Sequence, residues 1–144
     1  TARGWLQVGL LLKNQGRFED DQVVPSQWIT DMTTPATTNP NFGYQIWLGS
    51  PAGKERRYND KTLKAFHSEP YLTDDVIFID GFGGQRVYIV PSQDLIIIRT
   101  GRVVQDLQIL ENNWDDARLP NAILRGILPA AAASDSAPQA DLTP

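Results

Sequence analysis

The sequence predicts an α+β fold in which an antiparallel sheet is flanked by helices. Two apolar runs rich in β-branched residues, 86–90 and 95–100, are joined by the turn-forming segment PSQD at 91–94. Turn residues between two such runs are typical of a β-hairpin. Apolar residues recur near helical spacing at 2–14 and again at 114–128. Helices that precede and follow a set of strands indicate an α+β domain.

The N-terminal part of the chain predicts two helices followed by a strand. The first helix covers residues 2–14, and Gly16 supplies its C-terminal stop. After a short connector, a second helix begins near Pro25, which suits a first helical turn, and runs to about Met32. A loop rich in Thr, Pro and Asn follows, and the alternating, aromatic-rich segment 43–48 then predicts a strand.

The segment 49–75 lacks a regular apolar period and predicts a long loop. It is either a solvated loop or a functional segment that forms the rim of a cleft or contacts another subunit. Residues 76–80 predict a short strand that leads into the hairpin. The C-terminal helix at 114–128 is expected to begin near Leu119, because Pro120 suits only a first turn.

Length and composition limit the classes of protein to consider. A length of 144 residues suits one domain, which we place at 1–128, with a low-complexity tail at 129–144. A net charge of -4 provides no electrostatic footprint for nucleic acid. No apolar run is long enough to span a membrane. One histidine and no cysteine make a metal site unexpected, and no cofactor motif is present.

Glycines at 81, 83 and 84 surround Phe82 immediately before the hairpin. Glycine leaves the backbone open to close approach, and it weakens a strand interior. Two interpretations remain open at this point. The glycines form a bulge or tight bend, or they form a strand edge that lines a substrate cleft and offers backbone N–H groups to a ligand.

The stretch GFGGQRVYIVP at 81–91, followed by DLIII at 94–98, resembles the third-motif hairpin of a large serine-hydrolase family. That family comprises class C β-lactamases, D-alanyl-D-alanine carboxypeptidases, and related esterases and amide hydrolases. Three flanking segments are similar to family segments in the same order: TARGWLQVGLLL at 1–12, VPSQWI at 24–29 and FGYQIW at 42–47. The resemblance covers about residues 1–128 and only the C-terminal portion of the family.

The resemblance implies the C-terminal part of the β-lactamase/transpeptidase-like fold and acyl transfer through a serine. The family's nucleophile lies in an S-x-x-K motif, yet no serine here is followed by lysine three residues later. No tyrosine is followed two residues later by Asn or Ser either. We therefore expect a processed chain or fragment whose nucleophile is supplied by a separate N-terminal chain of the same enzyme. Family habit implies the periplasm or the cell exterior.

The third motif departs from the family pattern. Where members carry Lys-Thr-Gly or His-Thr-Gly, this sequence has Ile79-Asp80-Gly81 in one register and Phe82-Gly83-Gly84 in the other. The departure favours the esterase or amidase branch over β-lactam or peptidoglycan chemistry. By resemblance, the backbone N–H of Phe82 is a candidate oxyanion-hole donor. The alternative is that Phe82 is a core aromatic residue at the strand entry.

The remaining predicted substrate-binding residues are Gly81, Gly83, Gly84, Gln85, Tyr44 and Trp47. Gln85 contacts substrate or, equally, satisfies a bend, and both aromatic residues form core or cleft wall. The predicted function is hydrolysis of a small ester or amide through an acyl-serine intermediate. The alternative is a non-catalytic binding or scaffold protein that keeps the fold's hairpin without its nucleophile.

Overall fold

The computed structural model describes residues 1–51, 55–57, 64–66, 68–81, 84–101 and 115–128, and at 55–57 and 64–66 it describes only the backbone. Within these ranges the chain forms three α-helices, one 3-10 helix and antiparallel sheets. The predicted α+β class is confirmed, as is the antiparallel sheet flanked by helices. The predicted tail at 129–144 lies outside the described residues.

The central sheet has four antiparallel strands in the order β3-β6-β7-β8. The strands are β3 (Trp47–Leu48), β6 (Ile77–Gly81), β7 (Gln85–Val90) and β8 (Leu95–Arg99). β7 and β8 form the predicted hairpin, joined by the 3-10 turn η1 (Pro91–Gln93) and by Asp94 in the left-handed conformation at φ 49°. The predicted strand at 76–80 corresponds to β6.

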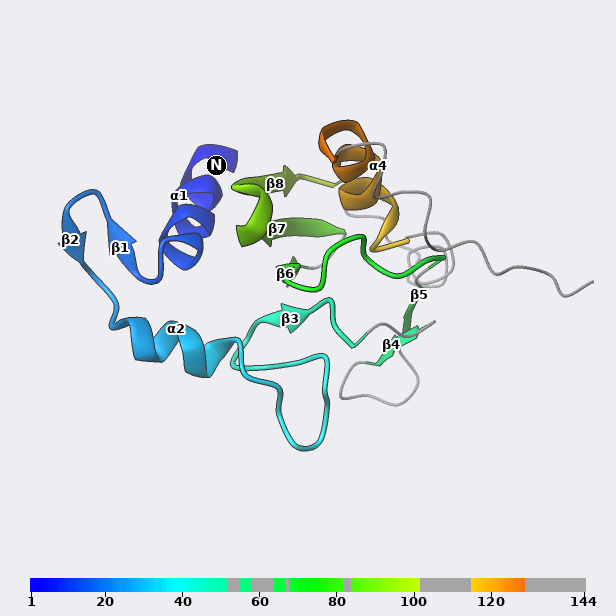
Figure 1. Ribbon diagram of the computed structural model, residues 1–144, viewed down its shortest axis with the longest axis horizontal. Coiled ribbons are helices and arrows are strands. Elements are labelled where there is room, and N and C mark those ends of the chain that lie inside the picture. Colours follow the sequence, from blue (N-terminus) through cyan, green and yellow to red (C-terminus); the bar gives the residue numbers. More distant parts are fainter. Residues whose placement is uncertain (52–54, 58–63, 67, 82–83, 102–114, 129–144) are drawn as a thin grey trace, which may run out of the picture.

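Helices cover both faces of this sheet (Figure 1). Helix α1 (Ala2–Lys13) packs against β7 and β8 on one face, where α2 (Ser26–Met32) also contributes to the core. Helix α4 (Arg118–Ile127) covers the opposite face. Because side chains alternate along a strand, each strand supplies both cores. In β7, Val87 lies on the α1 face and Tyr88 lies on the α4 face.

Helix α1 has the boundaries that its sequence predicts. The Thr1 hydroxyl accepts a hydrogen bond from the Gly4 N–H at 3.2 Å, which caps the first turn. After the helix, Gly16 adopts φ +82°, and a Cβ there would lie 2.0 Å from the Val24 carbonyl oxygen. Only glycine fits this close approach. The predicted stop at Gly16 is therefore confirmed, with the helix ending at Lys13.

The predicted strand at 43–48 is shorter than expected. Only β3 pairs with the sheet, because the backbone before it forms a turn instead. The Gly43 N–H donates to the Ile46 carbonyl at 2.9 Å, and the Tyr44 N–H donates to the Met32 carbonyl at 3.1 Å. Gln45 has φ 60°, which is incompatible with an extended strand.

Two segments that were expected to be loops contain short hairpins. The connector after α1 forms β1 (Arg17–Phe18) and β2 (Asp21–Gln22), which are joined by Glu19 and Asp20. The segment 49–75 contains β4 (Glu55–Arg57) paired with β5 (Lys64–Phe66). Neither strand pair has enough residues to show an alternating pattern. Helix α4 begins at Arg118, one residue before the predicted start.

Candidate functional site

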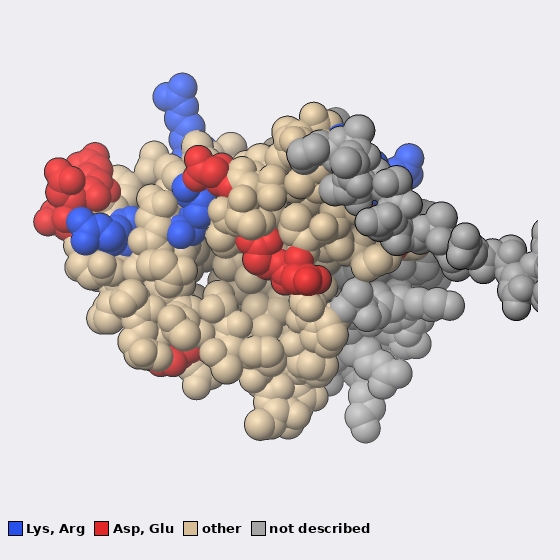
Figure 2. Space-filling model, in the orientation of Figure 1, with Lys and Arg blue, Asp and Glu red and all other residues tan. Residues whose placement is uncertain are grey.

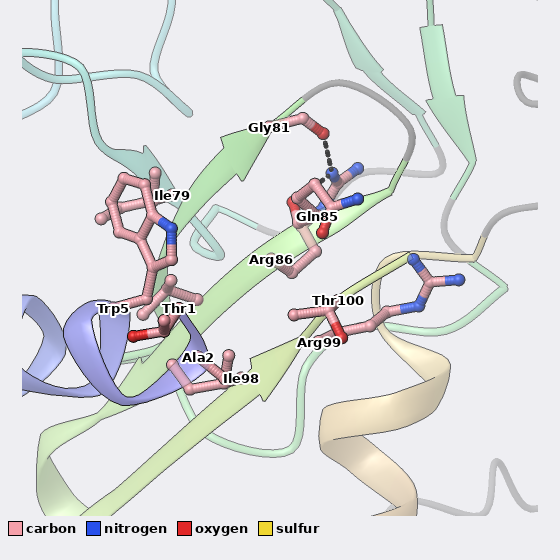
Figure 3. A pocket seen from close by; sticks show the side chains of 11 residues that line it. Thr1, Ala2, Trp5, Ile79, Gly81, Gln85, Arg86, Ile98, Arg99 and Thr100 are labelled. Carbon is pink, nitrogen blue, oxygen red and sulfur yellow. Dashed lines mark hydrogen bonds between the residues drawn. The ribbon is translucent and has the colours of Figure 1, made fainter. Parts of the chain in front are cut away.

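A pocket of about 320 Å³ opens at the N-terminus of α1, over the ends of β6, β7 and β8 (Figure 3). It lies on the α1 face of the sheet. The residues that line it are Thr1, Ala2, Trp5, Ile79, Gly81, Gln85, Arg86, Val87, Ile98, Arg99 and Thr100. The glycine turn that leads from β6 to β7 begins at its edge.

The floor of the pocket is one row of apolar residues across three strands. In the sheet register, Ile79 pairs with Val87, and Val87 pairs with Ile98. Residues paired in this way point to the same face of a sheet. Trp5 from α1 forms a side wall and is 49% exposed. A half-exposed indole beside branched aliphatic residues makes an apolar pocket open to solvent.

Gln85 lines the pocket at the first residue of β7. Its side-chain amide donates to the Gly101 carbonyl at 2.7 Å, and its side-chain carbonyl accepts from the Gly101 N–H at 3.0 Å. This pair of bonds continues the ladder beyond the last residue of β8. Both polar ends of the Gln85 side chain are therefore engaged with the backbone, as the bend-satisfying interpretation expects.

Behind the pocket, on the α4 face, lies a buried ionic cluster around Arg86. The Arg86 Nε donates to Asp116 at 3.0 Å, and Asp80 forms an ion pair with Arg86 Nη1. Arg86 is 5% exposed and Asp116 is fully buried. The Tyr88 hydroxyl donates to the Asp116 backbone carbonyl at 3.0 Å. Buried charges require such partners, because an unpaired charge in the interior is costly.

Arg86 also holds the backbone at the start of the glycine turn. Its Nη1 donates to the Gly81 carbonyl at 3.2 Å and to the Gln85 carbonyl at 2.9 Å. These carbonyls stand on either side of the turn, where Gly81 pairs with Gln85. A single guanidinium therefore connects both strands of the turn to the segment that precedes α4, through Asp116.

Gly84 is the position where the turn requires glycine. It has φ +76°, and a Cβ there would lie 2.4 Å from Arg99 Nη1, which itself donates to the Gly84 carbonyl. L-residues rarely adopt this backbone conformation. The tight-bend interpretation of the glycines thus has a physical basis at Gly84.

The structure brings together some of the predicted site residues. Gly81 and Gln85 line the pocket, and Gly84 lies next to Gln85 at the turn. Phe82 and Gly83 lie outside the described residues, so the oxyanion donor predicted at Phe82 stays a prediction.

The two predicted aromatic residues lie elsewhere. Trp47 is 8% exposed in the core of the α4 face, where its ring lies 4.5 Å from that of Phe42. Tyr44 is 58% exposed and packs against Trp28, with ring centroids 5.9 Å apart. Neither contributes to the pocket lining.

Sequence reasoning missed the apolar residues that form most of the pocket. Val87 and Ile98 occupy alternating positions in the predicted hairpin, and this pattern was the available signal. Trp5 was assigned only to a helix. The pairing of Arg86 with Asp116 joins residues 30 positions apart, and no local pattern indicates it.

The remaining chemistry of the described residues is sparse. They contain no group of three or more His, Cys, Asp or Glu side chains able to hold a metal ion. None of their helices is long and apolar enough to cross a membrane.

At the outer side of α4, the hydrogen bond from Arg125 lowers the pKa of Glu69 below its usual value. Figure 2 shows few charged side chains over much of the face in view.

The chain matches no protein-family model and no curated protein.

Proposed function

We propose that this chain forms one wall of the active-site cleft of a serine hydrolase that cleaves esters or amides. In this proposal, the chain is the C-terminal part of a domain with the β-lactamase/transpeptidase-like fold. The nucleophilic Ser and its Lys come from an S-x-x-K segment outside residues 1–144. The proposal takes the β6–β7 turn as the third motif and the adjacent pocket as part of the cleft.

The observation that carries the proposal is the position of Gly81. This residue begins the motif that resembles the family's third motif, and it lies at the edge of an open, apolar pocket. Apolar pockets with a few convergent polar groups are the usual sites for small molecules. The strand end and the helix N-terminus meet there, although 77 residues lie between Thr1 and Ile79 in the sequence.

The chemistry assigned to this chain is positioning and electrostatic stabilisation. The serine oxygen attacks the substrate carbonyl, the carbonyl oxygen becomes an oxyanion, and the alcohol or amine then leaves with a proton. Water next attacks the acyl-serine and releases the acid. A backbone N–H at the glycine turn stabilises the oxyanion in both steps. Arg86 donates to the Gly81 carbonyl and Arg99 donates to the Gly84 carbonyl, which restricts the rotation of these two carbonyl groups.

The proposal is tested by labelling the nucleophile. The assembly that contains this chain is purified through a tag, treated with a fluorophosphonate probe and digested for mass spectrometry. We expect the label on a serine of an S-x-x-K segment outside residues 1–144, together with hydrolysis of 4-nitrophenyl acetate. A label on a serine of this chain, or an assembly without labelling or hydrolysis, contradicts the proposal. The latter result favours the binding or scaffold alternative.

A further inference from the structure

We infer that Trp28 and Tyr44, the aromatic pair, form a surface site for a quaternary ammonium group such as that of choline, with the Asp31 carboxylate beside it. The site is separate from the pocket at the N-terminus of α1. Neither aromatic residue lines that pocket, and Figure 1 shows α2 well apart from that end of α1. The inference therefore does not depend on the proposed function.

The aromatic pair leaves both of its side chains open to solvent. Trp28 is 51% exposed and Tyr44 is 58% exposed, and their ring centroids lie 5.9 Å apart with the ring planes inclined by 44°. The face of an aromatic ring is electronegative and attracts a cation that lies within about 6 Å of the centroid. Because the two centroids are so close, one cation can lie within that distance of both. Two inclined rings therefore suit a compact, rounded cation.

The backbone holds Tyr44 beside α2. The Tyr44 N–H donates to the Met32 carbonyl at 3.1 Å. A Cβ on Gly43 would lie 1.9 Å from the same carbonyl oxygen, so the turn approaches α2 as closely as only glycine permits. Trp28 precedes Met32 by about one helical turn, and Ile29, at 2% exposed, anchors α2 to the core. Both rings are thus positioned before a ligand arrives, which reduces the entropy that is lost on binding.

The charge next to the aromatic pair is negative. Asp31 follows Trp28 by three residues, so their side chains are neighbours on the surface of α2. The Gln27 side-chain amide donates to the Asp31 carboxylate at 2.9 Å, which restrains the carboxylate. In the sequence from 22 to 51, Asp31 is the only charged residue. A carboxylate beside two aromatic faces attracts an organic cation.

A quaternary ammonium group fits this combination better than other cations do. Its charge is surrounded by methyl groups that contact ring faces, whereas a primary ammonium is compact and strongly hydrated. A metal ion requires several oxygen ligands, and the aromatic pair offers carbon faces beside one carboxylate. The carboxylate gives no advantage to a neutral hydrocarbon of the same shape. Charge is therefore the property that an experiment must vary.

The inference is tested by titrating the 144-residue chain with choline and with 3,3-dimethyl-1-butanol, in which carbon replaces the choline nitrogen. The indole N–H resonance of Trp28 reports on the aromatic pair, and that of Trp5 reports on the pocket at the N-terminus of α1. We expect choline to shift the Trp28 resonance with a millimolar Kd, and the neutral compound to bind at least about tenfold more weakly. Equal binding of the two compounds overturns the inference, as does an equal response of Trp5 to choline.

Two variants of Tyr44 separate the aromatic ring from its hydroxyl. Tyr44→Leu removes the ring but keeps an apolar side chain, and it should weaken choline binding about fivefold. Tyr44→Phe keeps the ring face and should bind choline within about twofold of the unmodified chain. The hydrogen bond from the Tyr44 backbone to α2 is available to both variants, and thermal melting checks that both are folded. Equal affinities of the two variants would overturn the inference.

Neutralising Asp31 tests the charge. Asp31→Asn should weaken choline binding about threefold at low ionic strength, and the loss should shrink as salt screens the attraction. Asp20→Asn makes the same change of charge at an exposed position between β1 and β2, and it should leave the affinity unchanged. Equal losses from the two variants would overturn the inference, because the attraction would then come from net charge rather than from the site.

Vesicles distinguish two sources of the quaternary ammonium group, a soluble compound and the head group of a lipid. The chain and its Trp28→Leu variant are sedimented with phosphatidylcholine vesicles. Sedimentation that the variant loses supports the site and assigns it to the lipid head group. Choline binding without sedimentation supports the site and assigns it to a soluble ligand. Sedimentation of the chain and the variant to the same extent, without choline binding, overturns the inference.

Discussion

The two faces of the central sheet are built from alternate residues of the same strands, yet they differ in how completely they are filled. On the α4 face, Phe78 and Tyr88 are fully buried, and the charges of Arg86 and Asp116 are paired within the core. On the α1 face, Ile89 is fully buried beneath α1, whereas Ile79 and Ile98 open into the pocket. The α4 face is therefore closed by buried and paired side chains, whereas the α1 face keeps an open apolar pocket at one end.

The largest loss of stability is expected on the α4 face. Asp116→Ala removes a fully buried partner of Arg86 and should destabilise the protein by about 3–5 kcal/mol, the usual cost of breaking a buried ion pair. Chemical denaturation measures this change. Asp31→Ala, at a partly buried surface position hydrogen-bonded to Gln27, is the control and should have a much smaller effect. Equal effects of the two variants would show that the cluster contributes no special stability.

A smaller loss is expected for the hydroxyl that joins this cluster. Tyr88→Phe removes the hydrogen bond to the Asp116 carbonyl and leaves a buried acceptor without that donor, at a cost of about 1–2 kcal/mol. Tyr44→Phe is the matched control, because its side chain is 58% exposed. We expect no measurable change in the midpoint of urea unfolding for the control. A silent Tyr88→Phe would contradict the role assigned to the hydroxyl.

Truncating a side chain on the α1 face should lower the free energy of unfolding less than truncating one on the α4 face. Trp5→Ala removes a half-exposed side chain, and we expect a loss below about 1 kcal/mol, because surface changes away from buried features are usually small. Phe78→Ala, on the fully buried side, should cost about 3–5 kcal/mol. Thermal and urea unfolding of the two variants compare the faces directly. A Trp5→Ala loss as large as that of Phe78→Ala would remove the distinction between them.

The smallest effect concerns the surface pair between Arg125 and Glu69. The pKa of Glu69 is lowered, so its ionised form contributes stability above the pKa of the unfolded chain, and this is lost as pH falls through the lower folded value. Arg125→Ala should lower the melting temperature slightly at pH 7 and have no effect once Glu69 is protonated. Melting curves recorded from pH 7 down to acid pH test whether the difference in melting temperature between the two proteins disappears as Glu69 is protonated. An effect that persists unchanged in acid would assign it to packing.

The elements that the sequence predicted well depend on local signals. The hairpin follows from two β-branched runs and a proline turn, and α1 follows from its periodicity and from Gly16. The short strand pairs β1–β2 and β4–β5 were missed because two or three residues show no period. The strand predicted at 43–48 is too long because the Gly43 N–H closes a turn onto the Ile46 carbonyl and the Tyr44 N–H bonds to the more distant Met32 carbonyl. An alternating apolar pattern indicates neither bond.

The candidate site was predicted only at its edge. The glycine motif indicated Gly81 and Gln85, which line the pocket, but its aromatic wall comes from α1 rather than from Tyr44 or Trp47. That wall depends on how a helix packs across the sheet. The burial of Arg86 beside Asp116 depends likewise on the docking of the segment before α4, which no spacing within the hairpin specifies.

The most direct test of the proposed function is the turnover of 4-nitrophenyl acetate by this chain assembled with the nucleophile-bearing chain that we propose. Gly84→Val introduces a side chain at a positive φ and against Arg99, so it should displace the turn. We expect about a hundredfold loss of kcat, as for misplacement of a catalytic group by about 1 Å. Gly126→Ala is the control, because a Cβ there meets no atom within 4 Å, and it should retain full turnover. Equal turnover of both variants, or a partner equally active without this chain, would contradict the account.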